Sequence, residues 1–599
     1  MNRQNSKRVF YIVAIICLLF SSCITTQPAE NFSSEPEDPN KPDIAVWRNV
    51  EPGIHSGFGS IDRAYSKSTP PEGPVRETIK LQGWKGERVS FKLLVWTAGS
   101  EEEISIEVRD LENADLRINK EQMTVSPVGY VLTDEFLNEI GAACGPRDND
   151  KVPVHIAPDI LLNNDRFILN GPVTRPVWVS VDIPAHAAAG IYNGVITMKY
   201  KSGTVDHPFT LEVQDKVLPP PAEWPFHLDL WQNPYAVARY HGVELWSEEH
   251  LDLLRPLLKM LADAGQKCIT AIIIDKPWDG ESIYDPFRSM IQWTKKTDGS
   301  WDFDYTIFDT YVNLAMESGI TKQIDCYSMV PITNKFTWYD EATSDTIVQV
   351  AIPGTEAYEA IWRDFLPDFR SHLEKRGWLD ITTIALDERA EEEMKNMFRF
   401  LEETAPEFKI TMAGFYHESV NESIYDFSSN WRDQWRIPAE AIQARRDKGL
   451  VTTYYVACGI PKPNNFTFSP PAEGTYEGWL AAAMGFDGFL RWAYNSWPED
   501  PMVDSRFIKF PAGDTFFVYP GPLSSIRFER LREGIQDYEK IRILRKALAE
   551  NRSPEAAAAK EKLLNFLHGI GSHTIHERTA DEVINEGKQL IYDIVNDVL

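Results

Sequence analysis

The feature that most constrains the fold is a change of pattern at the proline run Pro219-Pro220-Pro221. Prolines lack the backbone N–H that helices and sheets need, so this run ends any element and forms a stiff connector. After it, short apolar segments alternate with segments of helical periodicity. The expected strands are 226–231, 268–274, 322–330, 381–386, 409–413, 424–427, 450–458 and 488–493. Eight strands with interposed helices predict a (β/α)8 barrel over residues 222–525 rather than an open sheet.

Helical patterns fill most of the intervals between these strands. They are expected at 247–264, 308–318, 355–376, 390–404, 439–448 and 476–484. Ser247 is expected to cap the first of them, and Gly377 to end the third. Residues 526–599 are helical as well and predict a small C-terminal helical region. Its charged run 527–533 is expected to form an ion-paired helix face on the barrel.

Before the proline run, residues 44–216 show β patterning. Apolar residues alternate in Val177–Ile183, and a second strand pattern at 192–200 follows the turn residues Ala189-Gly190. Two strands about ten residues apart with a glycine turn predict a hairpin in a β-sandwich. The chain is therefore expected to be multidomain, with an N-terminal β-sandwich followed by the barrel and the C-terminal helices.

The N-terminal residues read as a targeting signal. Basic residues precede the apolar run 9–20, which is too short to span a membrane and fits a signal peptide over residues 1–22. The sequence Phe20-Ser21-Ser22-Cys23 resembles a bacterial lipobox, which would make Cys23 the acylated N-terminus of the mature protein. Residues 23–43 would then be a lipoprotein tether. This predicts a cell-envelope protein, lipid-anchored at the outer membrane and facing the periplasm or the surface; the alternative is a plain secreted protein.

Charge and cysteine content exclude several classes of partner and site. The chain carries 61 Lys and Arg against 89 Asp and Glu, a formal net charge of −28. Nucleic acids and anionic membrane surfaces need clustered positive charge, so neither is expected as the main partner. Cys144, Cys268, Cys326 and Cys458 follow the leader without metal-ligand spacing, and no disulfide can be read from them. The last three lie in apolar runs and are expected to be buried thiols.

Polar and aromatic residues gather where the barrel strands are expected to end, the usual place of reactive groups in this fold. They are Asp229, Trp231, Asn233, Asp275, Trp278, Tyr327, Asp387, Glu388, Tyr416, His417, Asn430, Trp431, Tyr454, Tyr455, Trp492, Tyr494, Asn495 and Trp497. Aromatic rings stack on the apolar faces of sugars, while carboxylates and amides bind hydroxyls. The set therefore predicts a site for neutral sugars.

The adjacent pair Asp387-Glu388 is the most specific of these features. It follows the apolar run 381–386 directly, and no basic residue occurs before Arg389. Two neighbouring carboxylates do not both ionise at low cost in a poorly solvated site, so one is expected to keep its proton and act as an acid. The alternative is that these residues begin the next helix, where acids are favourable near the N-terminus.

The chain resembles a known family at several motifs. An apolar strand that ends in Asp-Glu is similar to the substrate-assisted hexosaminidases of glycoside hydrolase families 20 and 84. The segments 485–495 (GFDGFLRWAYN), 513–514 (GD), 518–521 (VYPG) and 525–539 (SIRFERLREGIQDYE) resemble glycoside hydrolase family 123, the retaining β-N-acetylgalactosaminidases. The resemblance covers nearly the whole mature chain. Thr453-Tyr454-Tyr455 departs from the Trp-rich sequence expected there, which leaves the lining of the seventh strand open.

The resemblance implies a mechanism and residue roles. The substrate's own acetamido oxygen would attack the anomeric carbon, so no enzyme nucleophile is needed. Glu388 would be the general acid and base, and Asp387 would accept a hydrogen bond from the acetamido N–H. Tyr455 is expected to bind the acetamido oxygen, with Tyr416 as the second candidate. Trp492 and Trp431 are expected to contact the acetamido methyl group. The residues expected to bind the hydroxyls of the sugar are Asp514, Asn495, Asn233 and Tyr494. The expected substrate is a glycan with terminal β-linked N-acetylgalactosamine, and no metal or organic cofactor is implied.

Two other functions stay open at this stage. One is a non-catalytic glycan-binding lipoprotein that keeps the barrel as a scaffold. The other is a conventional two-carboxylate glycosidase that uses Asp275 or another strand-end acid as nucleophile.

Overall fold

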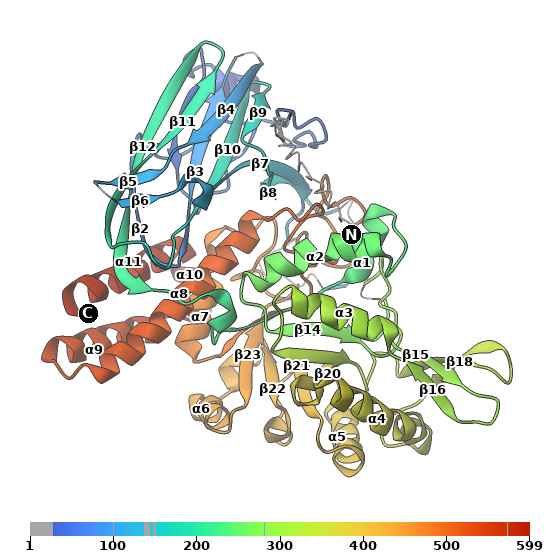
Figure 1. The fold of residues 1–599 in the computed structure, drawn as a ribbon. Helices are drawn as coiled ribbons and strands as arrows, with labels where there is room; N and C mark the ends of the chain where they lie inside the picture. Colours follow the sequence, from blue (N-terminus) through green and yellow to red (C-terminus); the bar gives the residue numbers. More distant parts are fainter. Residues whose placement is uncertain are drawn as a thin grey trace, which may run out of the picture.

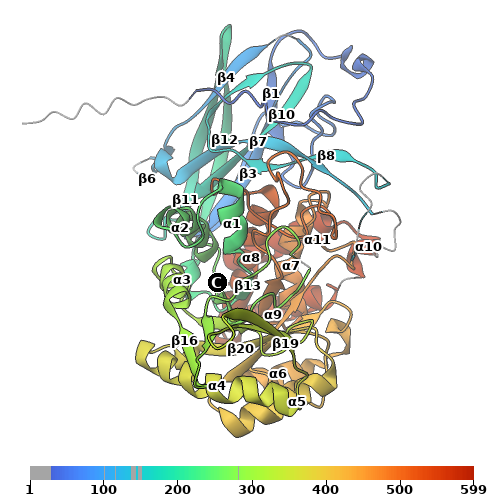
Figure 2. The ribbon, with the colours of Figure 1, turned by 90° about the vertical axis from the view of Figure 1, so that its right-hand side faces the viewer.

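The chain has a strand-rich N-terminal domain, an eight-stranded barrel and a group of C-terminal helices (Figures 1 and 2). The computed structural model describes residues 28–99, 101–114, 116–136, 144–145, 147, 151–280, 282–571 and 573–599. The expected signal peptide and the lipidation site Cys23 lie outside these residues. In the described part of the chain, no helix combines the length and the apolar character that crossing a bilayer requires.

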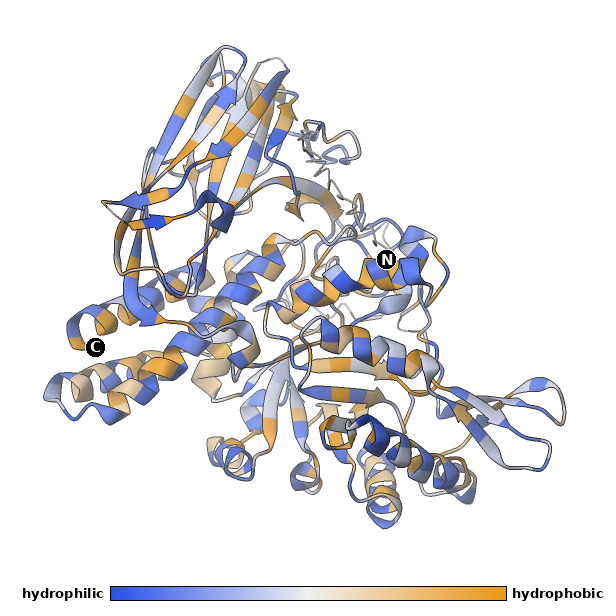
Figure 3. Ribbon diagram, in the orientation of Figure 1, coloured by the Kyte–Doolittle hydropathy of each residue, from blue (hydrophilic) through white to orange (hydrophobic). Residues whose placement is uncertain are grey.

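Two sheets form the N-terminal domain. One has the order β1 (His55–Gly59), β3 (Arg88–Thr97), β10 (Val173–Asp182), β7 (Met123–Thr133) and β8 (His155–Leu161). The other has β2 (Ile79–Lys85), β12 (Gly203–Val217), β11 (Gly190–Tyr200), β4 (Glu102–Val108) and β9 (Arg166–Leu169), with β5 (Leu111–Asn113) and β6 (Leu116–Ile118) at its side. Hydrophobic and hydrophilic residues alternate along these strands (Figure 3). The inward residues of both sheets, such as Leu93 and Val177 facing Ile196 and Leu211, enclose one apolar core, which is the packing of a β-sandwich.

The predicted hairpin between 177–183 and 192–200 is wrong. The first segment belongs to β10, which pairs with β3 and β7, and the second belongs to β11 in the opposite sheet. The hairpin partner of β11 is β12, in antiparallel register from Gly190 opposite Val213 to Tyr200 opposite Gly203. An alternating pattern of apolar residues shows that a strand buries one face. Two strands that pair in one sheet and two strands that face each other across a core have the same pattern, so the pattern does not identify a strand's partner.

The eight expected barrel strands are all present. They are β13 (His227–Leu230), β14 (Cys268–Ile272), β17 (Gln323–Tyr327), β20 (Thr382–Asp387), β21 (Lys409–Gly414), β22 (Asp426–Asn430), β23 (Val451–Tyr455) and β24 (Gly488–Arg491). They pair in parallel in the order in which they occur along the chain, and β24 returns to β13. Such an arrangement is a nearly closed barrel of the TIM type.

Two glutamines complete the seam between β13 and β14. One parallel bridge joins Leu228 to Gln266, and the N–H of Lys267 donates to the Leu228 carbonyl at 2.9 Å. Beyond that point, the side chain of Gln266 accepts from the Leu230 N–H at 2.9 Å, and that of Gln232 accepts from the Thr270 N–H at 2.9 Å. Side chains thus satisfy backbone donors where the two strands separate.

The helices around the barrel in the described part of the chain are α1 (Pro234–His241), α2 (Glu248–Ala262), α3 (Thr306–Glu317), α4 (Glu356–Arg376), α5 (Glu391–Thr404), α6 (Ala439–Asp447) and α7 (Ala472–Met484). All but α1 lie where helical patterns were expected. Ser247 caps α2 by accepting from the His250 N–H, and Gly377 ends α4 in the left-handed conformation (φ +72°). Between β21 and β22 the described chain contains only the short 3-10 turn Asn421–Ser423.

A small four-stranded sheet, which the sequence analysis did not predict, projects beside the barrel (Figure 1). Its order is β16 (Trp301–Asp304), β15 (Gln292–Lys295), β18 (Lys335–Asp340) and β19 (Asp345–Val350). One face carries Trp293 and Phe336, which pack against α4: the ring centroids of Trp293 and Phe365 are 4.4 Å apart. The aromatic face explains why these strands stay with the barrel.

The C-terminal helices are α8 (Ile526–Glu550), α9 (Pro554–His568), α10 (Thr574–Glu577) and α11 (Ala580–Val598). Helix α8 packs directly on α7 of the barrel. A Cβ atom on Gly478 would lie 2.0 Å from the carbonyl oxygen of Gly534, so the two backbones approach at a distance that only glycine permits. The C-terminal helices are thus continuous with the barrel.

The charged run at the start of α8 is buried against the sandwich, which corrects the expectation of a helix face on the barrel alone. Arg527 pairs with Asp159 of β8 at 2.9 Å, and Arg530 pairs with Asp62 at 2.6 Å. Both arginines are at most 5% exposed. Breaking a buried ion pair leaves an uncompensated charge, so these contacts hold the two domains in one orientation.

We expect Asp159→Asn to lower the free energy of unfolding by about 3 kcal/mol, because the cation of Arg527 would stay buried without an anionic partner. Urea unfolding monitored by circular dichroism measures the change. The control Glu317→Gln removes a pair with Arg255 whose side chains are 62% and 50% exposed, and it should cost less than about 1 kcal/mol. Equal effects of the two substitutions would contradict a stabilising role for the buried seam.

Candidate active site

The acid pair lies at the carboxyl end of β20, on the rim of the barrel. Asp387 is the last residue of the strand, and the N–H of Glu388 still donates to the Ala413 carbonyl of β21 at 2.9 Å. Helix α5 begins only at Glu391, so the two acids belong to the strand end rather than to the first turn of the helix. Asp387 is partly exposed and Glu388 is exposed, so both residues reach solvent at the rim.

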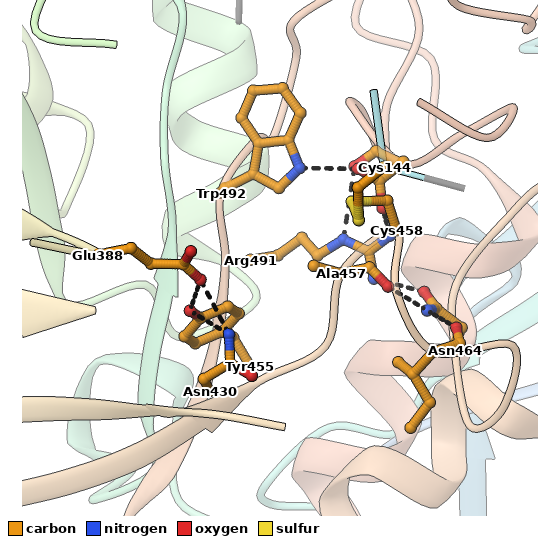
Figure 4. Close-up of a disulfide and its surroundings, with 11 residues drawn as sticks. Cys144, Glu388, Asn430, Tyr455, Ala457, Cys458, Asn464, Arg491 and Trp492 are labelled. Carbon is orange, nitrogen blue, oxygen red and sulfur yellow. Dashed lines mark hydrogen bonds and ion pairs between the residues drawn. A yellow bond between two sulfur atoms is a disulfide. The ribbon is translucent and has the colours of Figure 1, made fainter. Parts of the chain in front are cut away.

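Glu388 is held by two residues from β22 and β23, which lie two and three strands away from β20 (Figure 4). Its Oε1 accepts a hydrogen bond from the hydroxyl of Tyr455, at the end of β23, and one from Nδ2 of Asn430, at the end of β22, at 2.8 Å. Nδ2 of Asn430 also lies 2.8 Å from the Tyr455 hydroxyl oxygen. Burial raises the pKa of Tyr455 well above its ordinary value, and the carboxylates of Glu388 and Asp387 raise it further, so this hydroxyl stays a neutral donor.

Three aromatic residues gather at the ends of β13, β14 and β17. Trp231 stacks on Trp278 with ring centroids 5.0 Å apart, and Tyr327 lies 4.8 Å from both. The Tyr327 hydroxyl is buried without a hydrogen-bond partner. Burial raises its pKa well above the ordinary value, and the charge of Asp387 is among the further causes. These rings offer an apolar surface and one free donor near the acid pair.

Trp492 follows the end of β24 and is held there by a buried ion pair between Arg491 and Asp514. Its Nε1 donates to Oδ2 of Asp514 at 2.8 Å, while Oδ1 of Asp514 pairs with Arg491 at 2.8 Å. Both oxygens of Asp514 are therefore used within the protein, and this residue orients Trp492. The ring of Trp492 is partly exposed and lies 4.9 Å from that of Phe510.

Several of the predicted binding residues do not join the acid pair. Asn233 and Asn495 are buried. The amide group of Asn495 bonds to the backbone of Asn233, and that of Asn233 bonds to Ser496 and to the start of α1. The hydroxyl of Tyr494 donates to the Leu257 carbonyl of α2 at 3.0 Å. Tyr416 packs on Phe427, with ring centroids 6.2 Å apart, and no hydrogen bond links its hydroxyl to Glu388 in the described part of the chain.

Trp431 lies beside the loop that follows β23. A Cβ atom on Gly459 would lie 3.0 Å from its ring, which shows how closely the two approach.

Sequence reasoning placed Asn430 and Tyr327 at strand ends but gave them no role. The signal was their position as the last residue of a strand; what was missing was the direction in which each side chain points.

A disulfide between Cys144 and Cys458 ties the N-terminal domain to this loop (Figure 4). The expectation of a buried thiol is wrong for Cys458, whereas Cys268 and Cys326 are free and buried as predicted. Next to the disulfide, the Gly145 N–H donates to the Lys509 carbonyl at 3.0 Å. The N-terminal domain therefore reaches the rim of the barrel, three residues beyond Tyr455. The two cysteines are 314 residues apart, a pairing that spacing cannot reveal.

A buried polar network supports the same loop from behind. Asn464 accepts from Arg491 at 2.7 Å and donates to the Ala457 carbonyl at 3.0 Å, and its N–H donates to Glu473 at 2.9 Å. Burial raises the pKa of Glu473 to about 8 and that of Glu477 to about 7. Ionisation inside the protein is costly, so both carboxyl groups keep their protons to a higher pH than an exposed glutamate does.

Two groups of side chains have donor atoms close enough to hold a metal ion, among the residues that the structure describes. They are His227, Cys268 and Asp426, and Asp229, Cys268 and Asp325. Both lie inside the barrel toward the amino ends of the strands, away from the acid pair. Nε2 of His227 bonds directly to Asp426 at 2.8 Å; burial alone would lower the pKa of His227, but this carboxylate raises it to about 9. Trp231, Gln323 and Thr383 donate to the three carboxylates, whereas Oδ2 of Asp325 is buried without a hydrogen-bond partner among the described residues.

Comparison with known proteins gives a consistent picture. Residues 231–544 match the family model described as glycoside hydrolase 123, catalytic domain, and residues 58–200 match the glycoside hydrolase 123 N-terminal domain. A family 123 glycoside hydrolase from Clostridium perfringens, whose structure is described as giving the details of glycolipid glycan hydrolysis, is 26% identical, with a TM-score of 0.81. The match covers 91% of this chain and all of that one.

Two further solved structures are much less similar. A GH10 xylanase from termite gut is 9% identical with a TM-score of 0.30, over 78% of this chain and all of that one. A maltogenic α-amylase from Thermotoga neapolitana is 10% identical with a TM-score of 0.31, over 53% of this chain and 77% of that one. A search of curated protein sequences gave no match.

Reducing the disulfide should loosen the loop after β23. We expect treatment with dithiothreitol, or the double substitution Cys144→Ser and Cys458→Ser, to lower the free energy of unfolding by about 2–4 kcal/mol, because a long closed loop is released in the unfolded chain. Dithiothreitol should then have no further effect on the double variant. If reduction leaves the urea midpoint of the wild type unchanged, the disulfide does not contribute to stability.

The buried acid Glu477 should make the protein less stable as the pH rises. Its pKa of about 7 lies above its ordinary value of 4.5, so its contribution to stability is complete below pH 4.5 and is lost as the pH rises through 7. Glu477→Gln removes this dependence. Relative to the wild type, the variant should gain up to about 3 kcal/mol between pH 5 and pH 9 in urea unfolding. A difference that is the same at both pH values would show that Glu477 is not held neutral.

Proposed function

The chain belongs to glycoside hydrolase family 123, and on this basis we propose that it is an exo-acting β-N-acetylgalactosaminidase that works by a retaining, substrate-assisted mechanism. One observation carries the proposal: an Asp-Glu pair at the carboxyl end of a barrel strand, whose glutamate is hydrogen-bonded by Tyr455 and Asn430. An acid held by donors from two other strands has the fixed position that proton transfer requires.

The first step forms an oxazolinium ion. The acetamido carbonyl oxygen of the sugar attacks the anomeric carbon, and the bond from that carbon to the leaving oxygen breaks while Glu388 gives this oxygen its proton. Asp387 accepts a hydrogen bond from the acetamido N–H and stabilises the positive charge that develops there. In the second step Glu388 takes a proton from water, and the water oxygen bonds to the anomeric carbon. The bond from that carbon to the acetamido oxygen breaks, which restores the acetamide and gives net retention.

Tyr455 is the residue that we assign to the acetamido oxygen. Its hydroxyl is a neutral donor beside Glu388, and a donor aimed at this oxygen orients it for attack. Trp492 and Trp431 are partly exposed rings at strand ends, and we assign them to the acetyl methyl group and the face of the sugar.

Two alternatives are less well supported. A purely glycan-binding protein has no use for a carboxyl group held by two donors. A conventional mechanism would need a second free carboxylate, and the candidate Asp275 accepts a hydrogen bond from the Ser289 N–H at 2.8 Å within its own loop. The preference for N-acetylgalactosamine over its equatorial epimer rests on the family.

We further propose that the enzyme acts in the bacterial cell envelope, anchored at the outer membrane by a lipid on Cys23. The leader sequence supports this location, and a disulfide at the site is typical of proteins that fold in an oxidising compartment. The family 123 relative is described as hydrolysing glycolipid glycans, and we extend that substrate class to this chain.

Glu388→Gln should lower kcat/KM for 4-nitrophenyl N-acetyl-β-galactosaminide by about 100-fold or more, because the variant cannot transfer the proton. The control Glu392→Gln changes an exposed acid four residues away and should leave the rate unchanged. A thiazoline mimic of the oxazolinium ion should inhibit the wild type. Activity without thiazoline inhibition would indicate conventional chemistry, and a wild type inert on every β-hexosaminide would indicate a binding protein.

A further inference from the structure

The two oxygens of Glu388 have different surroundings. Oε1 accepts hydrogen bonds from the Tyr455 hydroxyl and from Nδ2 of Asn430, whereas no hydrogen bond reaches Oε2 from any residue that the structure describes. In Figure 4 the dashed lines meet at one of the two carboxylate oxygens. An oxygen that already accepts two hydrogen bonds is the poorer place for a proton, so the carboxyl proton belongs on Oε2.

The amide of Asn430 can be oriented in only one way. Its Oδ1 accepts the Arg432 N–H at 2.9 Å, which turns Nδ2 toward Glu388 and Tyr455. The two hydrogens of Nδ2 then serve Glu388 Oε1 and the Tyr455 hydroxyl oxygen, each at 2.8 Å. The single hydrogen of Tyr455 is left for Oε1. The three side chains therefore form a closed set with every hydrogen assigned.

We propose that Asn430 is a positioning residue that keeps Oε1 as a hydrogen-bond acceptor, so that Oε2 is the oxygen that transfers the proton in both steps. This inference rests on the proposed function, in which Glu388 is the general acid and base. In the first step the O–H bond at Oε2 breaks as the leaving oxygen gains that hydrogen. In the second step Oε2 takes a hydrogen from the attacking water.

Asn430 becomes more important once substrate is bound. When the Tyr455 hydroxyl donates its hydrogen bond to the acetamido oxygen instead, Oε1 loses one of its two donors. Only the N–H of Asn430 then donates to Oε1. The terminal torsion of a glutamate is broad and nearly two-fold, so little else would prevent the carboxyl group from exchanging its two oxygens. Asn430 is 5% exposed and is held by Arg432, which gives it the rigidity for this task.

The test is the dependence of the rate on the leaving group. A well-positioned acid matters most when the leaving oxygen is a poor leaving group and needs a proton, and least for an activated phenol. We expect Asn430→Ala to lower kcat/KM at least about tenfold more for phenyl N-acetyl-β-galactosaminide than for the 2,4-dinitrophenyl compound. Asn430→Asp has nearly the same shape and can still accept from Arg432, but it lacks both donors, and it should show the same selective loss.

Asp387→Asn provides the contrasting variant, because it acts on the acetamido group and should reduce the rates on both compounds alike. The thermal midpoint of each variant shows whether the fold is intact. If the wild type is active and both Asn430 variants lose activity equally on the two compounds, the role of Asn430 is refuted while the proposed function stands. If the wild type releases no sugar from either compound, the proposed function itself fails.

Discussion

Closure of the parallel sheet is the constraint on which the rest of the structure depends. Parallel strands in a barrel bring all their carboxyl ends to one rim, so residues far apart in the chain become neighbours. Glu388 meets Asn430 across 42 residues of sequence and Tyr455 across 67. The seam between β13 and β14 is completed by Gln232 and Gln266, whose side chains replace missing backbone bonds. Polar side chains at this seam are therefore part of what gives the rim its shape.

The N-terminal domain is part of the same construction. Buried ion pairs on α8 fix the sandwich against the barrel, and the disulfide of Cys144 with Cys458 brings a sandwich segment to the loop behind Tyr455. Arg491 and Asn464 hold that loop from the other side. A glycan-binding module on a flexible linker would have neither kind of contact. The loop that follows β23 is thus held by both domains.

Burial decides the charge state of the groups behind the site. Burial raises the pKa values of Glu473 and Glu477 because ionisation in the interior is costly, and Tyr455 is kept as a neutral hydroxyl for the same reason. Neutral groups can be packed densely as donors and acceptors without a counter-ion. The acid pair differs, because it lies at the rim with access to water, where the proposed reaction requires a proton to arrive and to leave.

Periodicity, caps and short motifs are local properties of the chain, so the eight strands, most of the helices, the place of the Asp-Glu pair after β20 and the family motifs could be predicted from the sequence. Long-range packing set the rest: 177–183 and 192–200 lie in opposite sheets, Cys144 pairs with Cys458, and the charges of α8 are buried between domains. It also separated Asn430, which points to Glu388, from Asn495, which bonds to the backbone of Asn233. The physical reason is the same in each case: a pattern shows that a residue ends a strand or lies on one face of an element, but the partner it meets depends on long-range packing.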